Sequence, residues 1–255
     1  MPARLAAPTS YWRLSRAPRY SLLFSLPLLA AYEGLAALLS HGHGADVRNG
    51  AEVLLDALFS LVAGPRGSMI VVGVVVLGCV ALAGRDMRRS GARLQGRVFW
   101  LMLAESAVLA VVGGLLLGIA TARLLHAVSP HLAIVAGPRP AEAAFGWPTR
   151  LMLALGAGLF EELVFRVLLV GGLAFGLRRV MGAGPMVAGG VASLVGAVVF
   201  AAAHYVGVYG DAFTLASFTF RALAGLFFSV LFVLRGFGIA AWTHALYDVM
   251  VLVVR

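Results

Sequence analysis

Residues 68–84 read SMIVVGVVVLGCVALAG, an apolar run without a charged side chain. A helix that crosses the hydrocarbon core of a bilayer needs about 20 mostly apolar residues, because each residue adds only about 1.5 Å. A shorter amphipathic stretch at 51–63 is expected to lie at the interface or to re-enter the membrane. The pattern predicts an all-α, polytopic membrane helical bundle of about 7–8 transmembrane helices. The other runs that approach or exceed the spanning length are residues 20–40, 99–128, 150–177, 185–206, 212–234 and 237–254.

The composition of the 255-residue chain supports the same class. Hydrophobic residues make up 61% and charged residues 12%, whereas a soluble domain is roughly half apolar and a quarter charged. A chain of this length could not bury so much apolar surface inside itself. No internal repeat and no long linker interrupts the runs, so we expect a single integral membrane domain over residues 1–255.

The arginines predict how the chain is oriented in the membrane. All 20 basic residues are Arg, but they are scattered through short loops, so we expect no nucleic-acid partner. The absence of Lys and the abundance of Ala, Gly and Arg indicate a GC-rich bacterium, and hence its inner membrane. Threading seven spans from a cytoplasmic N-terminus follows the positive-inside rule. It places on the cytoplasmic side Arg4, Arg13, Arg16, Arg19, Arg85, Arg88, Arg89, Arg93, Arg97, Arg178, Arg179 and Arg235.

Polar residues inside the apolar runs carry the functional signal. A charge at the bilayer centre costs about 2.5–3.5 kcal/mol on insertion scales, so it needs a partner or a function. We expect these residues to line a polar cavity within the membrane. Three clusters lie on three C-terminal runs, and they are Glu161-Glu162-x-x-x-Arg166, Phe200-x-x-x-His204 and His244-x-x-x-Asp248.

The first cluster pairs two carboxylates with one guanidinium. Successive residues of a helix point about 100° apart, so the two carboxylates cannot share one direction. Glu162 and Arg166 are four residues apart on one face, which predicts an intrahelical ion pair. That pairing would leave Glu161 as the carboxylate that reacts. A purely structural charge cluster is the alternative.

The two histidines complete the candidate site. An imidazole near the end of an apolar helix, as at His204, is often a packing residue, whereas His244 and Asp248 share one helical face. Two carboxylates and two imidazoles on three helices together resemble a water-activating site. Hydrolysis at such a site needs a base for water, and Glu161 with His204 could supply it. It also needs an oxyanion stabiliser, which His244 could provide.

The three motifs, in this order within about a hundred residues, resemble those of the CPBP family. These are the CAAX prenyl endopeptidases and bacteriocin-processing intramembrane proteases. The resemblance covers residues 150–252 as a catalytic core and leaves 1–149 as scaffold helices. It implies a bundle around a water-filled chamber and hydrolysis of a peptide bond within the membrane. The site residues that it implies are Glu161, Glu162, Arg166, His204, His244 and Asp248.

The resemblance also assigns roles to these positions. Glu161 and His204 would activate water, while His244 and Asp248 would hold the oxyanion. The best-known eukaryotic members have Asn where this chain has Asp248. An ionised Asp would repel an oxyanion, so this role requires either a protonated Asp248 or one that orients His244.

The family is often labelled a metalloprotease, which raises the question of a cofactor. The motif H-E-x-x-H is absent, and the ligands would come from three separate helices. We therefore expect no cofactor and a glutamate-type mechanism. Zinc held by Glu161, His204 and His244 is the alternative.

The expected substrate is a membrane-anchored protein or peptide within the lipid bilayer. A proton- or ion-coupled transporter is the first rival function, because Glu33 and Glu105 also lie in apolar runs. A non-catalytic scaffold or immunity protein that keeps the family fold is the second. No repeated halves, which many transporters contain, are found in the sequence.

The predicted spans leave one geometric mismatch. On straight helices Glu161 lies about 11 residues, or roughly 16 Å, in from the non-cytoplasmic end of its run. His204 falls near that same surface, whereas His244 falls nearer the cytoplasmic one. The three can meet only if the run 185–206 starts late, the connection 206–211 dips into the membrane, or the helices tilt.

Overall fold

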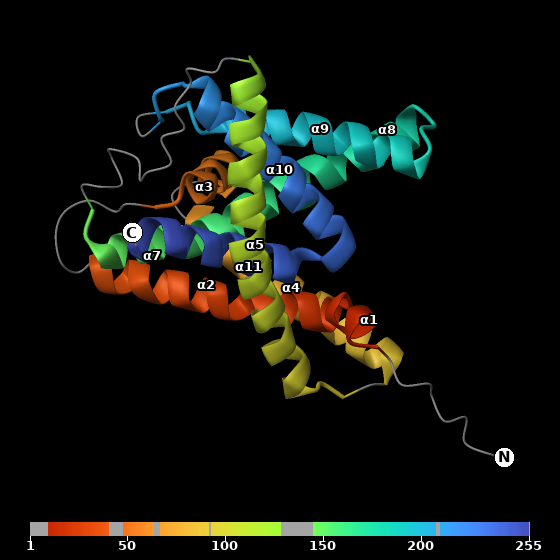
Figure 1. Ribbon diagram of the computed structural model, residues 1–255. Helices are drawn as coiled ribbons and strands as arrows, with labels where there is room; N and C mark the ends of the chain where they lie inside the picture. Colours follow the sequence, from red (N-terminus) through yellow and green to blue (C-terminus); the bar gives the residue numbers. More distant parts are fainter. Residues whose placement is uncertain are drawn as a thin grey trace.

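The computed structural model describes residues 10–40, 48–63, 67–91, 93–128, 145–207 and 210–254, and within these ranges the chain forms helices and no strand (Figure 1). The predicted all-α class is confirmed. In chain order the elements are α1 (Tyr11–Ser15), α2 (Pro18–Ser40), α3 (Gly50–Ala63), α4 (Gly67–Ser90), α5 (Gly96–Val128), α7 (Trp147–Gly156), η2 (Ala157–Glu161), η3 (Leu163–Val170), α8 (Gly171–Val180), α9 (Pro185–Ala203), α10 (Leu215–Arg235), α11 (Phe237–Val249) and η4 (Met250–Val254).

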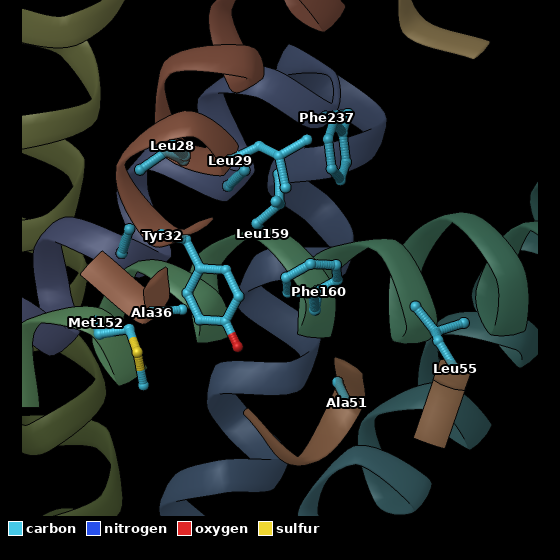
Figure 2. Packing of buried hydrophobic residues seen from close by; sticks show 12 residues of the cluster. Leu28, Leu29, Tyr32, Ala36, Ala51, Leu55, Met152, Leu159, Phe160 and Phe237 are labelled. Carbon is cyan, nitrogen blue, oxygen red and sulfur yellow. The ribbon is translucent and has the colours of Figure 1, made fainter. Parts of the chain in front are cut away.

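Helix α11 lies at the centre of the bundle, in contact with α2, α5, α7, η2 and α10. Most of its residues are buried, and several are small, which allows neighbouring helices to approach closely. Two hydrogen bonds join it to α2: the Trp242 indole donates to the Phe24 carbonyl at 2.6 Å, and the Gly238 amide donates to Ser21 Oγ at 2.9 Å. Figure 2 shows Phe237, at the start of α11, packed beside side chains of α2. The site residues of α11 therefore sit on a fixed helix.

The predicted run 150–177 is helical but not a regular α-helix. It passes from α7 through the π-helical segments η2 and η3 before α8 resumes the α-helix. A π turn contains an extra residue and is often found at functional sites. The expectation of a uniform 100° step is therefore wrong over this segment, which contains Glu161 and Arg166.

Four helices of the described chain are long and apolar enough to cross a membrane, and they are α2, α5, α9 and α10. Their outward faces expose large apolar side chains, such as Leu115, Val198 and Val230, which suits contact with lipid. The other predicted runs are also helical, in α4, in α7 to α8 and in α11 to η4. The number of 7–8 spans and the cavity stay predictions.

Several arginine-bearing segments gather at one end of the bundle. Figure 1 shows α1, the end of α8 and the α10–α11 turn on one side, and the C-terminus with the start of α7 on the other. Arg19 at the start of α2 pairs with Asp86 near the end of α4 at 2.7 Å. This arrangement agrees with a shared side for these arginines, and the cytoplasmic assignment stays a prediction. Arg4 lies outside the described residues.

A buried ion cluster attaches α1 to the bundle. Arg235 donates to both carboxylate oxygens of Glu105, at 2.5 and 2.6 Å, and its guanidinium lies 3.7 Å from the centre of the Trp12 ring. The Tyr11 hydroxyl donates to the same carboxylate. Burial and this hydrogen bond raise the pKa of Tyr11. Glu105 is therefore a structural residue with a charged partner.

Gly158 allows η2 to lie against α11, and its substitution tests this packing. A Cβ at Gly158 would lie 2.5 Å from the Ala241 carbonyl oxygen and 2.6 Å from Ala245 Cβ. We expect Gly158→Ala to lower the free energy of unfolding by about 1–3 kcal/mol, because the core would be overpacked. The melting temperature of the detergent-purified protein measures this loss. Gly172→Ala on α8, where no atom lies within 4 Å, is the control. Equal stability of the two variants would contradict the packing.

Candidate active site

The structure brings the six predicted site residues into one cluster. They come from η2 and η3, from the residue that follows α9, and from α11. The ion-pair separations that connect their side chains range from 2.8 to 4.0 Å. The members are Glu161, Glu162, Arg166, His204, His244 and Asp248.

Glu161 faces both imidazoles through one oxygen. Its Oε2 lies 3.9 Å from His204 Nε2 and 4.0 Å from His244 Nε2. These separations are longer than a direct hydrogen bond, but each pair of atoms could be bridged by a water molecule. A water about 2.8 Å from Glu161 Oε2 and from one Nε2 atom would make an angle of about 90° between its two contacts. The three atoms therefore outline a position where a water molecule could be activated.

Hydrogen bonds on the far side of each ring define the tautomers. His204 Nδ1 lies 2.8 Å from the Phe200 carbonyl oxygen, which can only accept, so Nδ1 carries a proton. In the neutral ring, His204 Nε2 then presents a lone pair toward Glu161. His244 Nδ1 lies 2.8 Å from Glu162 Oε1, and it donates to that oxygen when the carboxylate is ionised.

The predicted ion pair between Glu162 and Arg166 is confirmed. Arg166 Nε lies 3.3 Å from Glu162 Oε2, and the two side chains are 1% and 0% exposed. The Arg166 guanidinium also lies 4.3 Å from the centre of the Phe200 ring and 5.5 Å from that of Phe228. Glu162 thus has an ion-pair contact with Arg166 on Oε2 and a 2.8 Å contact with His244 on Oε1, and Oε2 has no hydrogen-bond partner within the described residues.

Two phenylalanines hold the charged groups in place. Phe228 stacks on His244 with ring centres 4.5 Å apart and an interplanar angle of 19°. Phe200 meets His204 edge-on at 4.8 Å, and it also contacts Arg166. The Phe of the F-x-x-x-H motif therefore packs against both Arg166 and His204. Phe228 was not predicted, because an aromatic residue within an apolar run has no distinctive spacing.

Asp248 and Glu162 approach opposite nitrogens of the same ring. Asp248 Oδ2 lies 3.6 Å from His244 Nε2, the nitrogen that also faces Glu161. Glu162 holds the other nitrogen at the shorter distance of 2.8 Å. Glu162 is therefore better placed than Asp248 to orient His244.

The structure brings Glu161, His204 and His244 together despite the mismatch expected for straight helices. Helix α9 starts at Pro185, as the predicted run does, so a late start is not the reason. The α-helix ends at Ala203, and the Asp211 amide donates to the His204 carbonyl at 2.9 Å. The connection that follows α9 therefore folds back onto His204. Figure 1 also shows α10 running obliquely to α9 and α11 in this view.

Asn49 is a member of the cluster that sequence reasoning missed. Its Nδ2 donates to Glu161 Oε1 at 3.3 Å, and the residue is 6% exposed. It belongs to the segment 1–149, which the motifs do not cover. A single Asn before an amphipathic helix carries no sequence signal for such a contact.

Zinc bound by Glu161, His204 and His244 would require these side chains to lie closer together than they do. Four ligands at about 2.0–2.1 Å in a tetrahedron place ligand atoms about 3.3 Å apart, whereas both imidazoles are farther than this from Glu161 Oε2. Within the described ranges, no group of three or more His, Cys, Asp or Glu side chains is arranged to hold a metal ion.

The segment that contains the three motifs matches a protein-family model. Residues 143–250 match the family model described as type II CAAX prenyl endopeptidase, Rce1-like. This confirms the predicted resemblance. The matched segment contains all six predicted site residues, and it supports an intramembrane protease of the CAAX type in general. Such a protease acts on a membrane-embedded protein or peptide in a lipid environment. Neither a curated protein nor a solved structure matches the chain.

Arg166→Ala tests the buried ion pair of the Rce1-like segment. The variant leaves the Glu162 carboxylate buried without its guanidinium, and breaking such a pair commonly costs about 3–5 kcal/mol. We expect a matching fall in the free energy of unfolding, measured by thermal denaturation in detergent, together with loss of cleavage.

The double variant Glu162→Gln with Arg166→Met is the matched control. It removes both charges, so it should be more stable than Arg166→Ala even if it is inactive. A single variant as stable as the wild type would contradict the buried pair.

Proposed function

We propose that this protein is an intramembrane endopeptidase in which Glu161 and His204 activate water for attack on a peptide bond. The observation that carries the proposal is the position of Glu161 Oε2, within 4.0 Å of the Nε2 atoms of both imidazoles. The substrate is a membrane-associated or C-terminally anchored protein or peptide. No metal or other cofactor takes part.

The proposed reaction begins with water beside Glu161. The carboxylate accepts a proton from the water as its oxygen attacks the carbonyl carbon, and the neutral His204 shares this proton through its Nε2 lone pair. The tetrahedral intermediate collapses when the C–N bond breaks. The proton that the water gave up then passes to the leaving amine. The products are a new carboxyl terminus and a new amino terminus.

The proposed oxyanion stabiliser is His244. Its Nδ1–H is directed to Glu162, so only an imidazolium ring can offer a second N–H to the developing oxyanion. The carboxylates of Glu161 and Glu162 around this ring would balance its charge. Its stacking on Phe228 keeps Nε2 directed at the reacting centre.

We further propose that Asp248 is protonated in the active form. Three carboxylates face His244, and Arg166 neutralises Glu162. A proton on Asp248 lowers the repulsion among the three carboxyl groups. Its O–H also provides a second donor near the oxyanion, beside the N–H of His244. Because Glu162 already orients the ring, Asp248 need not be ionised for that purpose.

Asp248→Asn tests the protonated form, because Asn offers a neutral donor at every pH. We expect the variant to cleave within about threefold of the wild-type rate at neutral pH, well inside the effect of one oxyanion donor. Asp248→Ala is the matched control without a donor and should be slower than both. Loss of activity in Asp248→Asn at all pH values would contradict this role.

The wider arrangement proposed for the protein follows from the same account. Residues 1–255 form a single integral membrane domain, with scaffold helices in 1–149 and the catalytic core in 150–252. The protein lies in the bacterial inner membrane with a cytoplasmic N-terminus, and the arginines at one end of the bundle support this orientation. Nucleic acid has no part in the proposal.

The transporter is less well supported than the protease. The two acids that favoured it are both paired: Glu33 lies 3.2 Å from Arg48, and Glu105 forms a bidentate pair with Arg235. Such pairing suits a structural role better than a proton relay. A non-catalytic scaffold has no need of the polar cluster that surrounds His244.

Glu161→Gln tests the proposed base. The variant keeps the size of the side chain but cannot accept the proton, so cleavage should fall at least a thousandfold with an unchanged melting temperature. A general base contributes roughly a 10²–10⁴-fold rate increase, and the variant also loses the negative charge of Glu161. Purified protein in lipid vesicles is assayed with a prenylated peptide that ends in a CAAX sequence. A second assay incubates the enzyme with a bacterial membrane extract and identifies the new protein N-termini that cleavage creates.

Glu105→Gln is the matched control, because it removes a carboxylate outside the site. Cleavage per folded molecule should stay near the wild-type value. Metal analysis of the active preparation tests the proposal that no metal takes part in the reaction. Stoichiometric zinc, with activity lost on chelation and restored by zinc alone, would overturn it. Full cleavage by Glu161→Gln would overturn the mechanism.

A further inference from the structure

The amide of Asn49 has a fixed orientation beside Glu161. Asn49 Oδ1 accepts a hydrogen bond from the Ala51 amide at 2.9 Å, in the manner of an N-cap for α3. A backbone N–H can only donate, so the atom that faces it must be the oxygen. The Nδ2 donor is therefore the atom that faces Glu161 Oε1 at 3.3 Å.

The backbone of Asn49 is held as firmly as its side chain. Its N–H donates to the Tyr32 hydroxyl at 3.2 Å, and that hydroxyl donates to Glu52 on α3. Tyr32 is fully buried and meets the ring of Phe160, the residue before Glu161, edge-on at 5.3 Å. In Figure 2 the Tyr32 ring lies beside Phe160, and its hydroxyl points toward the segment that bears Ala51.

Helix α7 also presses close to Asn49. A Cβ at Gly156 would lie 2.6 Å from the Tyr32 ring and 3.0 Å from Asn49 Cβ, so glycine is needed at this contact. Arg48 adds a pair of 3.2 Å contacts to Glu33 and Glu52 on α2 and α3. The start of α3 is therefore fastened to the same helical segment that carries Glu161.

The two oxygens of Glu161 consequently have different surroundings. Oε1 accepts from the Asn49 amide, while Oε2 faces His204 and His244. A donor on Oε1 limits rotation of the carboxylate about its last bond. An amide cannot act as a base at neutral pH, so Asn49 does not itself accept the proton from water.

We propose that Asn49 is a positioning residue, which holds the Glu161 carboxylate so that Oε2 stays directed at the water position between the two imidazoles. The inference rests on the proposed function, since it assumes that Glu161 is the base. It assigns to the N-terminal segment a direct part in the site, and the substrate need not touch Asn49.

A pair of substitutions separates this role from the capping of α3. Asn49→Ser keeps an oxygen that can cap the Ala51 amide, but the shorter side chain cannot reach Glu161. Asn49→Ala loses both the cap and the donor. We expect both variants to lower kcat about 10- to 100-fold with KM unchanged, because a small misplacement of a catalytic group has effects of this size. Only Asn49→Ala should also lower the melting temperature.

An infrared measurement gives a readout that needs no substrate. The wild-type spectrum minus that of Glu161→Gln isolates the carboxylate stretch of Glu161. The spectrum of Asn49→Ser minus that of the double variant Asn49→Ser with Glu161→Gln isolates the same band without the Asn49 donor. We expect this band to be shifted, because Oε1 has lost its hydrogen bond. The assay uses the prenylated CAAX peptide, or the membrane-extract protein that the wild type cleaves.

The outcomes of these experiments are distinct. Wild-type kcat and an unshifted band in Asn49→Ser would overturn the positioning role. Activity that follows melting temperature alone in the two variants would also overturn it, because capping would then explain the effect. In the Glu161→Gln background, Asn49→Ser should cause no further loss. If Glu161→Gln itself cleaves normally, the proposed function fails whatever the Asn49 variants do.

Discussion

The fully buried carboxylate of Glu162 is the constraint on which the candidate site depends. A charge in that position is tolerated only if both of its oxygens have partners, and here they are Arg166 and His244. The first partner comes from the next turn of the same helical segment, and the second comes from α11. Satisfying one charge therefore fixes the segment against α11 and sets the direction of the His244 ring. Glu161, the next residue in the chain, is thereby placed beside Nε2.

The packing around Glu162 and Arg166 also holds their helical segment against α11. Gly158 lets η2 approach the backbone of α11, and the rings of Phe200 and Phe228 both lie near the Arg166 guanidinium. Glu161 and Glu162 approach one imidazole from opposite nitrogens, and π-helical segments flank Glu162 on both sides. A regular α-helix was the expectation for this run. The departure falls where the polar residues lie, as is common at functional sites.

Sequence reasoning succeeded where the information is local. The four-residue spacing of Glu162 and Arg166 predicted their ion pair, since i and i+4 share a helical face whatever surrounds them. The apolar runs predicted the helices for the same reason. The three motifs also predicted which segments meet, but only through the family resemblance, because spacing within a helix carries no information about its neighbours.

The features that escaped prediction all depend on tertiary contacts. Asn49 lies more than a hundred positions before Glu161, and nothing in its own neighbourhood marks it. Arg235 was expected in a cytoplasmic connection, yet it is 2% exposed and paired with Glu105 on another helix. The π turns likewise have no sequence pattern of their own here.

The central claim is that water between Glu161 and His204 attacks a carbonyl held by His244. The most direct measurement is an experimental structure of Glu161→Gln in lipid, bound to a peptide that it fails to cleave. The account predicts the carbonyl carbon about 3–3.5 Å from a water between residue 161 and His204, with the carbonyl oxygen in hydrogen-bond range of His244 Nε2. A peptide bound away from this cluster, or a metal ion held by these residues, would contradict it.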